Sequence, residues 1–229
     1  MLIHGLQKMT LLDYPEHVAC TVFLSGCDFR CPYCHNFELV DGSASPIMSE
    51  DEFFGFLDKR HGLLDGVAIT GGEPLMRPDL ASFIKKIREM GYLIKLDTNG
   101  YHPDRLKELL EENLLDYIAM DIKNSFEKYP TTIGLSDINI SLIKDSISLI
   151  MGSGVDYEFR TTVIKEFHEK DDFEKIGTTI CGAKRYFLQQ FVERDTVPDC
   201  SLSAPSAEDM ELFLRTARIH VKNAQIRGL

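Results

Sequence analysis

The sequence has few basic residues, no long apolar run and no leader-like start, and each absence narrows the possible functions. Lysine and arginine number 25 against 36 aspartate and glutamate residues, a formal net charge of −11. This balance argues against a general binder of nucleic acid or of anionic membranes. No apolar run approaches the roughly 20 residues that a membrane span requires. Residues 1–5 lack the basic and apolar regions of a signal peptide, so we expect none.

Cysteine is scarce as well, and the six cysteines divide into one cluster and three isolated residues. Cys20, Cys181 and Cys200 stand alone in the sequence. We therefore expect free thiols in a reducing cytoplasm rather than a framework of disulfides. Cys20 falls within an apolar stretch typical of a strand, so it is expected to pack in the core.

The chain contains no linker, low-complexity segment or internal repeat that would divide it. A length of 229 residues suits one domain with a substantial core. We therefore predict a single domain over residues 1–229. Within it, residues 1–17 are interpreted as an N-terminal arm and residues 192–229 as a C-terminal extension.

Three cysteines lie close together with the spacing Cys-x3-Cys-x2-Cys, namely Cys27, Cys31 and Cys34, and Tyr33 precedes the third. Such a loop can wrap three thiolates around one iron–sulfur cluster. Iron–sulfur cubanes usually take four cysteine ligands, and no fourth cysteine lies in this loop, so one iron would stay open to a substrate. Two simpler interpretations remain: three buried structural cysteines, or a zinc loop with His35 as the fourth ligand.

Apolar stretches alternate with amphipathic segments along the chain. The predicted strands are residues 18–24, 66–70, 93–97, 117–121, 157–163 and 186–191. Capping boxes at Ser49–Glu52 and Ser206–Asp209 predict the starts of two of the intervening helices. Short connections between alternating strands and helices predict a parallel α/β architecture. The pattern alone does not distinguish a doubly wound sheet from an open barrel.

Candidate site residues follow these strands at their carboxyl ends, where parallel α/β folds gather their active sites. The first strand leads into the cysteine loop, and the others end in or carry Gly71, Gly72, Glu73, Pro74, Asp97, Thr98, Asn99, Asp121, Lys123 and Arg160. Glycines let a backbone approach a ligand, and a carboxylate can receive an ammonium group, although a plain strand-to-helix turn would explain Gly71–Pro74 equally well. A local ion pair is the alternative for Asp121 and Lys123, and a structural salt bridge for Arg160.

The run Cys-Asp-Phe-Arg-Cys-Pro-Tyr-Cys-His-Asn at residues 27–36 resembles the cluster loop of radical S-adenosylmethionine (SAM) enzymes. Together with Asp13-Tyr14-Pro15 and Phe23-Leu24-Ser25-Gly26, it is similar to the activating enzymes of glycyl-radical proteins. The narrowest resemblance is to the activating proteins of anaerobic ribonucleoside-triphosphate reductase. It implies a partial (βα)6 barrel of the TIM type. It also implies a [4Fe–4S] cluster on the three cysteines with one open iron, and SAM as cofactor.

The resemblance also implies roles for the candidate residues. Tyr33 would border the adenine, and the Gly71-Gly72-Glu73-Pro74 turn would grip the methionine end of SAM. Asp97-Thr98-Asn99 matches a pattern that lines the cofactor pocket and can hold a monovalent cation. Asp121 and Lys123 match an Asp-x-Lys pattern that helps bind the cofactor, and Arg160 could pair with the cofactor carboxylate.

Two departures from the relatives stand out. Residues 188–191 contain no histidine, whereas the pyruvate formate-lyase activating enzyme has one there near the adenine, so the adenosine contact on this strand is unassigned. The short stretch between Cys34 and Ser49 leaves no room for the ferredoxin-like insert of some activating enzymes. His35 could tune the cluster through a hydrogen bond, and the other histidines are expected to be solvated or structural.

The implied activity is reductive cleavage of SAM to a 5′-deoxyadenosyl radical, followed by formation of a glycyl radical on a partner enzyme. That partner is most narrowly anaerobic ribonucleoside-triphosphate reductase, with flavodoxin or ferredoxin as electron donor. The chain has no added domain to enclose a small substrate, which favours a protein partner. Two alternatives remain: a radical SAM enzyme acting directly on a small molecule, peptide or tRNA, and a non-catalytic iron–sulfur or zinc protein.

Overall fold

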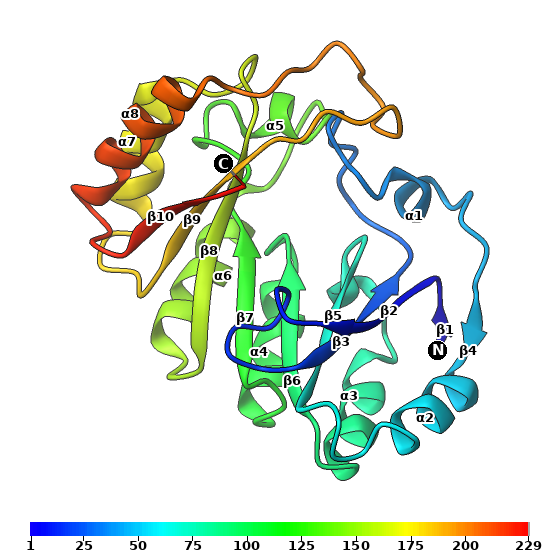
Figure 1. Cartoon of the computed structure of the whole chain (residues 1–229). Coiled ribbons are helices and arrows are strands. Elements are labelled where there is room, and N and C mark those ends of the chain that lie inside the picture. The colour runs from blue at the N-terminus through cyan, green and yellow to red at the C-terminus, as the bar shows by residue number, and fades with distance from the viewer. Residues whose placement is uncertain (229) are drawn as a thin grey trace.

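The computed structural model describes residues 1–228 as a curved, largely parallel sheet with helices along its outer side (Figure 1). The strands are β1 (Leu2–Ile3), β2 (Gly5–Thr10), β3 (Ala19–Leu24), β4 (Met48–Ser49), β5 (Gly66–Gly71), β6 (Leu93–Thr98), β7 (Tyr117–Asp121), β8 (Asp156–Val163), β9 (Tyr186–Gln190) and β10 (Ala224–Arg227). The α-helices are α1 (Phe37–Asp41), α2 (Glu50–Asp58), α3 (Leu80–Glu89), α4 (Pro103–Glu111), α5 (Tyr129–Thr132), α6 (Ile140–Gly152), α7 (Lys170–Thr179) and α8 (Ala207–Arg218), and Pro74–Met76 form a 3-10 turn, η1.

The main sheet has the order β10-β9-β8-β7-β6-β5-β3-β2, in which every pair is parallel except β2 with β3. Each parallel strand therefore lies beside the one that precedes it in this sheet, which is the order of a barrel rather than of a doubly wound sheet. In the described residues, β2 and β10 form the two edges and do not pair with each other. The predicted partial barrel is confirmed.

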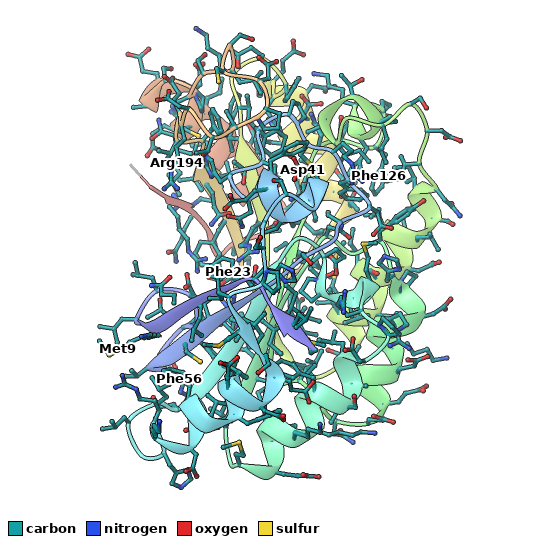
Figure 2. The ribbon with its side chains drawn as sticks, turned by 90° about the vertical axis from the view of Figure 1, so that its right-hand side faces the viewer. Met9, Phe23, Asp41, Phe56, Phe126 and Arg194 are labelled. Atoms are coloured by element: carbon teal, nitrogen blue, oxygen red, sulfur yellow. The ribbon has the colours of Figure 1, made fainter. Side chains whose placement is uncertain are left out.

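The predicted strands occupy six consecutive places in this sheet, with ends shifted by a residue or two. The structure adds an edge strand at each side: β2 falls within residues 1–17, and β10 falls within residues 192–229. Neither carries a long apolar run, because β2 mixes polar and apolar residues along an exposed edge and β10 is only four residues long. Met9 on β2 is 64% exposed and projects into solvent (Figure 2).

The helix starts follow the predicted caps in one case and only partly in the other. Ser49 and Glu52 form a complete capping box at the start of α2. At α8, Ser206 Oγ accepts the bond from the Asp209 N–H, but the Asp209 carboxylate accepts from the Ser206 hydroxyl instead of from its backbone N–H. The second predicted box is therefore half formed.

The core lies between the sheet and the helices. On β5, Val67, Ala68 and Ile69 are all fully buried, as expected for a parallel strand covered on both faces. The apolar faces of α3 and its neighbours complete the layer; α3 contributes Phe83 and Ile87. No helix among residues 1–228 combines the length and apolar character that crossing a membrane would take.

Candidate active site

A cavity of about 260 Å³ opens at the carboxyl ends of the parallel strands, close to the ~300 Å³ at which small-molecule sites begin. It is lined by the predicted site residues Cys27, Cys31, Tyr33, Cys34, Gly71, Gly72, Asp97, Thr98, Asn99, Asp121, Lys123 and Arg160. The two remaining predicted residues, Glu73 and Pro74, are buried and do not line the cavity. The rule that active sites gather at the carboxyl ends of parallel strands thus brings together predicted residues at or near the ends of four strands, β5 to β8, and from the loop after β3.

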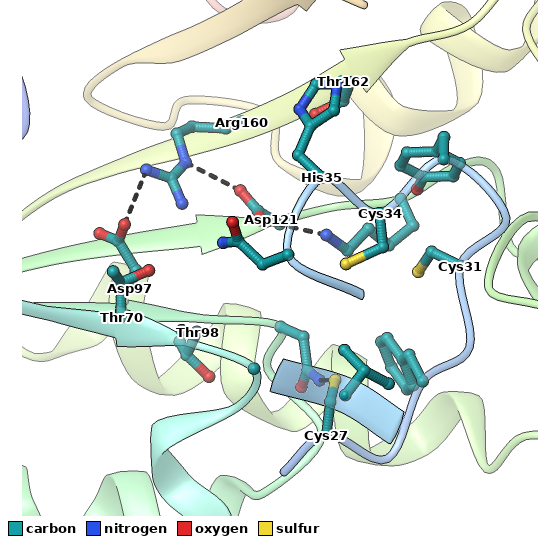
Figure 3. Close-up of a pocket in the computed structure, with 18 of the residues that line it drawn as sticks. Cys27, Cys31, Cys34, His35, Thr70, Asp97, Thr98, Asp121, Arg160 and Thr162 are labelled. Carbon is teal, nitrogen blue, oxygen red and sulfur yellow. Dashed lines mark hydrogen bonds and ion pairs between the residues drawn. The ribbon is translucent and has the colours of Figure 1, made fainter. Parts of the chain in front are cut away.

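The three cysteines surround one part of this cavity, with Cys27 on the opposite side from Cys31 and Cys34 (Figure 3). The amide of Asn99 donates to Cys27 Sγ at 3.8 Å. Burial raises the pKa of Cys27 to about 12 and that of Cys31 to about 11, so both thiols hold their protons until a metal displaces them. Within residues 1–228, no three His, Cys, Asp or Glu side chains are grouped to hold a single metal ion.

Gly71 and Gly72 pack the end of β5 against the start of the cysteine loop. Gly71 has φ +130°, and a Cβ there would lie 2.1 Å from the carbonyl oxygen of Leu24. A Cβ on Gly72 would lie 2.1 Å from the carbonyl oxygen of Gly26, the residue before Cys27. Both glycines are therefore needed for contact between two backbones, whatever ligand the turn also meets.

Glu73 supports this turn and the end of β6 from behind. Its carboxylate accepts hydrogen bonds from Thr98 Oγ1 at 2.8 Å, from the Asn99 N–H at 2.6 Å and from the Leu75 N–H at 3.1 Å. Burial outweighs these donors and raises the pKa of Glu73 to about 7. The structure thus gives Glu73 an internal structural role, and its predicted contact with an ammonium group stays a prediction.

Five charged side chains form one chain of alternating sign across β6, β7 and β8 and just beyond the end of β7. Lys95 donates to Asp97, and Arg160 Nη1 donates to the other oxygen of Asp97 at 3.3 Å. Arg160 Nε donates to Asp121 at 2.8 Å, and Lys123 Nζ donates to Asp121 at 3.1 Å (Figure 3). Three cations thus meet two carboxylates, which leaves the network as a whole with a net charge of +1. Four of its members line the cavity, and the buried Lys95 does not.

The carboxylates of this network stay ionised despite burial. Burial alone would raise the pKa of Asp121, but Arg160 and Lys123 outweigh it and hold that pKa well below its usual range. The pKa of Asp97 is lowered in the same way, chiefly by Arg160 and Lys95. The predicted ion pair of Asp121 and Lys123 and the predicted salt bridge of Arg160 are therefore present as parts of one network that faces the cavity.

Some residues at the site were not identified from the sequence. Lys95 is 2% exposed inside an apolar strand, and the only available signal was that a buried lysine needs an acidic partner. Thr162 on β8 and Gln189 on β9 also line the cavity. Gln189 lies on the strand whose contact with the adenosine the sequence left unassigned. It is the residue of that strand that lines the cavity.

Tyr33 and His35 flank Cys34 and both line the cavity. Tyr33 is 5% exposed, and its buried hydroxyl, which lies close enough to Cys31 to offset part of the rise in pKa that burial causes in that thiol, has no hydrogen bond of good geometry among the described residues. A buried hydroxyl without a partner is costly, which suits a place where a polar ligand completes the bond. His35 is held by the chain that follows β9, since its Nε2 donates to the Val192 carbonyl oxygen at 2.7 Å.

Comparison with known proteins identifies the family. The family model of the radical SAM superfamily matches residues 21–177. A protein of Methanocaldococcus jannaschii named as a glycyl-radical enzyme activating enzyme is 31% identical over 100% of this chain and 96% of its own length. The pyruvate formate-lyase-activating enzyme of Clostridium pasteurianum is 32% identical over 53% of this chain, which spans about half of that enzyme, 52%.

Solved structures agree on the fold. A domain of a pyruvate-formate lyase-activating enzyme from Bacteroides vulgatus is 19% identical with a TM-score of 0.59, covering 71% of this chain and 99% of that domain. Streptococcus suis SuiB bound to its precursor peptide SuiA is 12% identical with a TM-score of 0.71, covering 91% of this chain and 48% of SuiB. At these identities the likeness concerns the fold alone.

The chain belongs to the radical SAM superfamily, whose members hold a [4Fe–4S] cluster on three cysteines and use SAM. Within that superfamily it is an enzyme similar over its full length to one named for activating glycyl-radical enzymes. The residues present fit both cofactors. Three thiols surround the cavity, a net positive network faces it, and the Tyr33 hydroxyl is left for a polar partner.

Proposed function

We propose that the chain activates a glycyl-radical enzyme, and that this partner is anaerobic ribonucleoside-triphosphate reductase. The observation that carries the proposal is the alignment over 100% of this chain and 96% of a relative named as a glycyl-radical enzyme activating enzyme. The choice of the reductase rests on the resemblance of the loop at residues 27–36 and on the absence of a histidine from residues 188–191.

The residues that line the cavity support this proposal, because their side chains suit the parts of both cofactors. Cys27, Cys31 and Cys34 would hold the cluster, which supplies one electron to split SAM into methionine and a 5′-deoxyadenosyl radical that takes a hydrogen atom from the partner's glycine. Arg160 and Lys123, the two cations of the network that line the cavity, would receive the SAM carboxylate.

The remaining cavity residues would orient SAM and shield it. The Gly71–Gly72 backbone lies beside Cys27 and would meet the methionine end, while Tyr33 and Gln189 would approach the adenosine. No general base is required of these residues, because hydrogen-atom transfer moves no proton to the protein. We propose flavodoxin or ferredoxin as the electron donor.

A second candidate is an enzyme that acts on a small molecule directly. It is favoured by partial alignments: a 7-carboxy-7-deazaguanine synthase of Methanospirillum hungatei is 31% identical over 63% of this chain and 58% of its own length. A GTP 3′,8-cyclase of Synechocystis is 28% identical over 73% of this chain and 50% of its own length. Neither of these two alignments covers nearly the whole of both proteins, whereas the alignment with the activating enzyme of Methanocaldococcus jannaschii does.

The deciding experiment mixes the anaerobically reconstituted protein with SAM, a reductant and an anaerobic ribonucleoside-triphosphate reductase from the same source. We expect 5′-deoxyadenosine and a glycyl-radical signal in electron paramagnetic resonance. Formation of 5′-deoxyadenosine without a signal on the reductase, or on other glycyl-radical enzymes, would contradict the activase and favour the second candidate.

The variant Cys31→Ala tests the cluster assignment itself. We expect it to lose the iron and with it 5′-deoxyadenosine formation, because two thiolates do not hold a cubane. Cys181→Ala is the matched control, since Cys181 is an exposed free thiol far from the loop in sequence. A Cys31→Ala protein with the iron content of the control would overturn the assignment.

A further inference from the structure

The chain that follows β9 takes a detour before it enters α8. Residues 191–205 run across the carboxyl side of the sheet toward the cysteine loop and then return, as the orange segment of Figure 1 shows. We refer to residues 191–205 as the strap. Its first residue is continuous with β9, since the Phe191 N–H donates to the Val163 carbonyl oxygen at 3.1 Å.

The strap is anchored at intervals by buried and hydrogen-bonded residues, although residues 192–196 are exposed. Val197 and Leu202 are 5% and 6% exposed, so it has apolar anchors of its own. On its return, Ser203 bonds both carboxylate oxygens of Glu166, at 2.6 and 3.0 Å, and its carbonyl oxygen accepts from the Lys165 N–H at 3.1 Å. A segment held in this way is a part of the site's architecture rather than a loose connection.

The strap meets the cysteine loop at two points. The ring of His35 stacks on that of Phe191, with centroids 5.5 Å apart and planes at 4°, and its Nε2 donates to the Val192 carbonyl oxygen at 2.7 Å. Farther along, the Asp199 N–H donates to the Pro32 carbonyl oxygen at 2.9 Å. The segment between these two contacts therefore spans the loop.

Both contacts fall directly after a cysteine of the cluster motif. Pro32 follows Cys31, and His35 follows Cys34. A contact one residue from a ligand restricts the backbone that carries the ligand without occupying the metal. Ordering a flexible loop costs conformational entropy, so contacts that order the loop beforehand favour binding of the cluster.

We infer that His35 is a positioning residue, and that the strap, fastened by His35 and by the Asp199 N–H, holds Cys31 and Cys34 in the arrangement that retains the cluster. This inference rests on the cluster site that the family supplies and not on the identity of the partner. It assigns to the first part of the C-terminal extension a role in the cofactor site, and leaves α8 and β10 as parts of the barrel wall.

The test measures the rate at which reconstituted protein loses iron to a chelator under anaerobic conditions. His35→Ala removes both the stacking and the donor, and we expect release about tenfold faster, the lower range for groups that support a ligand. His35→Gln keeps an N–H donor that can reach the Val192 carbonyl oxygen, and should recover most of the difference. Asp199→Pro removes the donated N–H and should also accelerate release, whereas Asp199→Ala keeps it.

A second readout separates positioning from general stability. Hydrogen exchange on the cluster-free protein should show the Asp199 amide protected in the wild type and exchanging at least about tenfold faster in His35→Ala, with an unchanged melting temperature. Equal iron release from His35→Ala and wild type, or an unprotected Asp199 amide in the wild type, would overturn the inference. Faster iron release from His35→Ala, as expected, together with failure of the wild-type protein to activate the reductase, would count against the proposed function alone.

Discussion

At the scale of single residues, the site is governed by how buried charges are matched. Lys95, Asp97, Arg160, Asp121 and Lys123 form an unbroken chain of ion pairs, and all of them except Lys95 line the cavity. Breaking a buried pair exposes an uncompensated charge, so these residues hold one another's ionisation state as well as their geometry. The opposite case is Glu73, a buried carboxyl that is matched only by neutral donors and one distant histidine.

The pKa of Glu73 gives a prediction for stability against pH. Its folded pKa is raised from 4.5 to about 7, so the folded state keeps a proton that the unfolded state releases between these values. The stability that this proton adds to the folded state is complete below about pH 4.5 and is lost as the pH rises through about 7. The free energy of unfolding should therefore fall by about 3 kcal/mol across this range, at 1.36 kcal/mol per pKa unit.

We therefore expect Glu73→Gln to remove this slope from the free energy of unfolding of the cluster-free protein. Urea titrations at pH 5, 6 and 7 measure it. Glu211→Gln, at an exposed position on α8, should keep the wild-type slope. Parallel pH profiles for Glu73→Gln and wild type would show that Glu73 does not titrate in this range.

The charge network also bears on the expected monovalent-cation site. Asp97 belongs to the Asp97-Thr98-Asn99 pattern that the resemblance assigns to such a site, yet its carboxylate already bonds two cationic side chains, Lys95 and Arg160. We expect SAM affinity to change by less than about twofold when potassium is replaced by choline, because this acceptor is neutralised within the protein. Equilibrium dialysis of the cluster-loaded protein measures the affinity. A tenfold loss of SAM affinity in choline would contradict this expectation and support a monovalent-cation site.

At the scale of elements, the site depends on close contact between the ends of β3 and β5. The register pairs Leu24 with Gly71, and the Gly72 N–H donates to the Leu24 carbonyl oxygen at 2.8 Å. The Glu73 N–H donates to the Gly26 carbonyl oxygen, again at short distance, 2.6 Å. The cysteine loop thus begins on a backbone ladder that continues past the last residues of the two strands.

A methyl group at Gly72 should force this ladder apart. We expect Gly72→Ala to destabilise the cluster-free protein by about 2 kcal/mol, since overpacking against backbone has no flexible side chain to relieve it. Gly55→Ala is the control: Gly55 lies inside α2 with open space around it, and alanine there should stabilise by about 0.5–1 kcal/mol. Urea denaturation of both variants measures the difference, and equal stability would contradict the contact.

At the scale of the whole molecule, the carboxyl-terminal strand closes one flank of the barrel through a single buried carboxylate. Glu158 on β8 is 1% exposed and accepts two bonds from Arg227 on β10, at 2.7 and 2.9 Å, and one from the Tyr117 hydroxyl at 2.8 Å. The Arg227 guanidinium also lies 3.3 Å from the ring centre of Phe187. These contacts join four strands, β7 to β10, at the end of the barrel opposite the cavity.

Arg227→Met should therefore leave Glu158 buried without its charge partner. We expect a loss of about 3 kcal/mol, the low end for a broken buried pair, because the Arg227 side chain is 36% exposed. Lys222→Met, at an exposed position just before β10, is the control and should change the free energy of unfolding by less than about 0.5 kcal/mol. A similar small change for Arg227→Met would show that β10 is held by its backbone bonds alone.

The local patterns of the chain account for the central strands and for most of the cavity. Apolar runs mark the six parallel strands, and the rule that their carboxyl ends meet brings Asp97, Asp121 and Arg160 together. Contacts between segments that are distant in sequence do not correspond to any local pattern. His35 and Val192 are 157 positions apart, and Arg227 and Glu158 are 69 positions apart, with no local pattern that relates either pair. Lys95 was not identified as a site residue because its apolar neighbours dominate the strand pattern.

The order of the strands has a consequence for synthesis on the ribosome. Each parallel strand can dock on the one made just before it, so the wall of the barrel can grow as the chain emerges. The cysteines emerge well before residues 191–205, which fasten their loop; His35 and Val192 are 157 positions apart. Iron that arrives before residues 191–205 have been made would meet an unfastened loop, so we expect the cofactor to be retained only after that segment has emerged and docked.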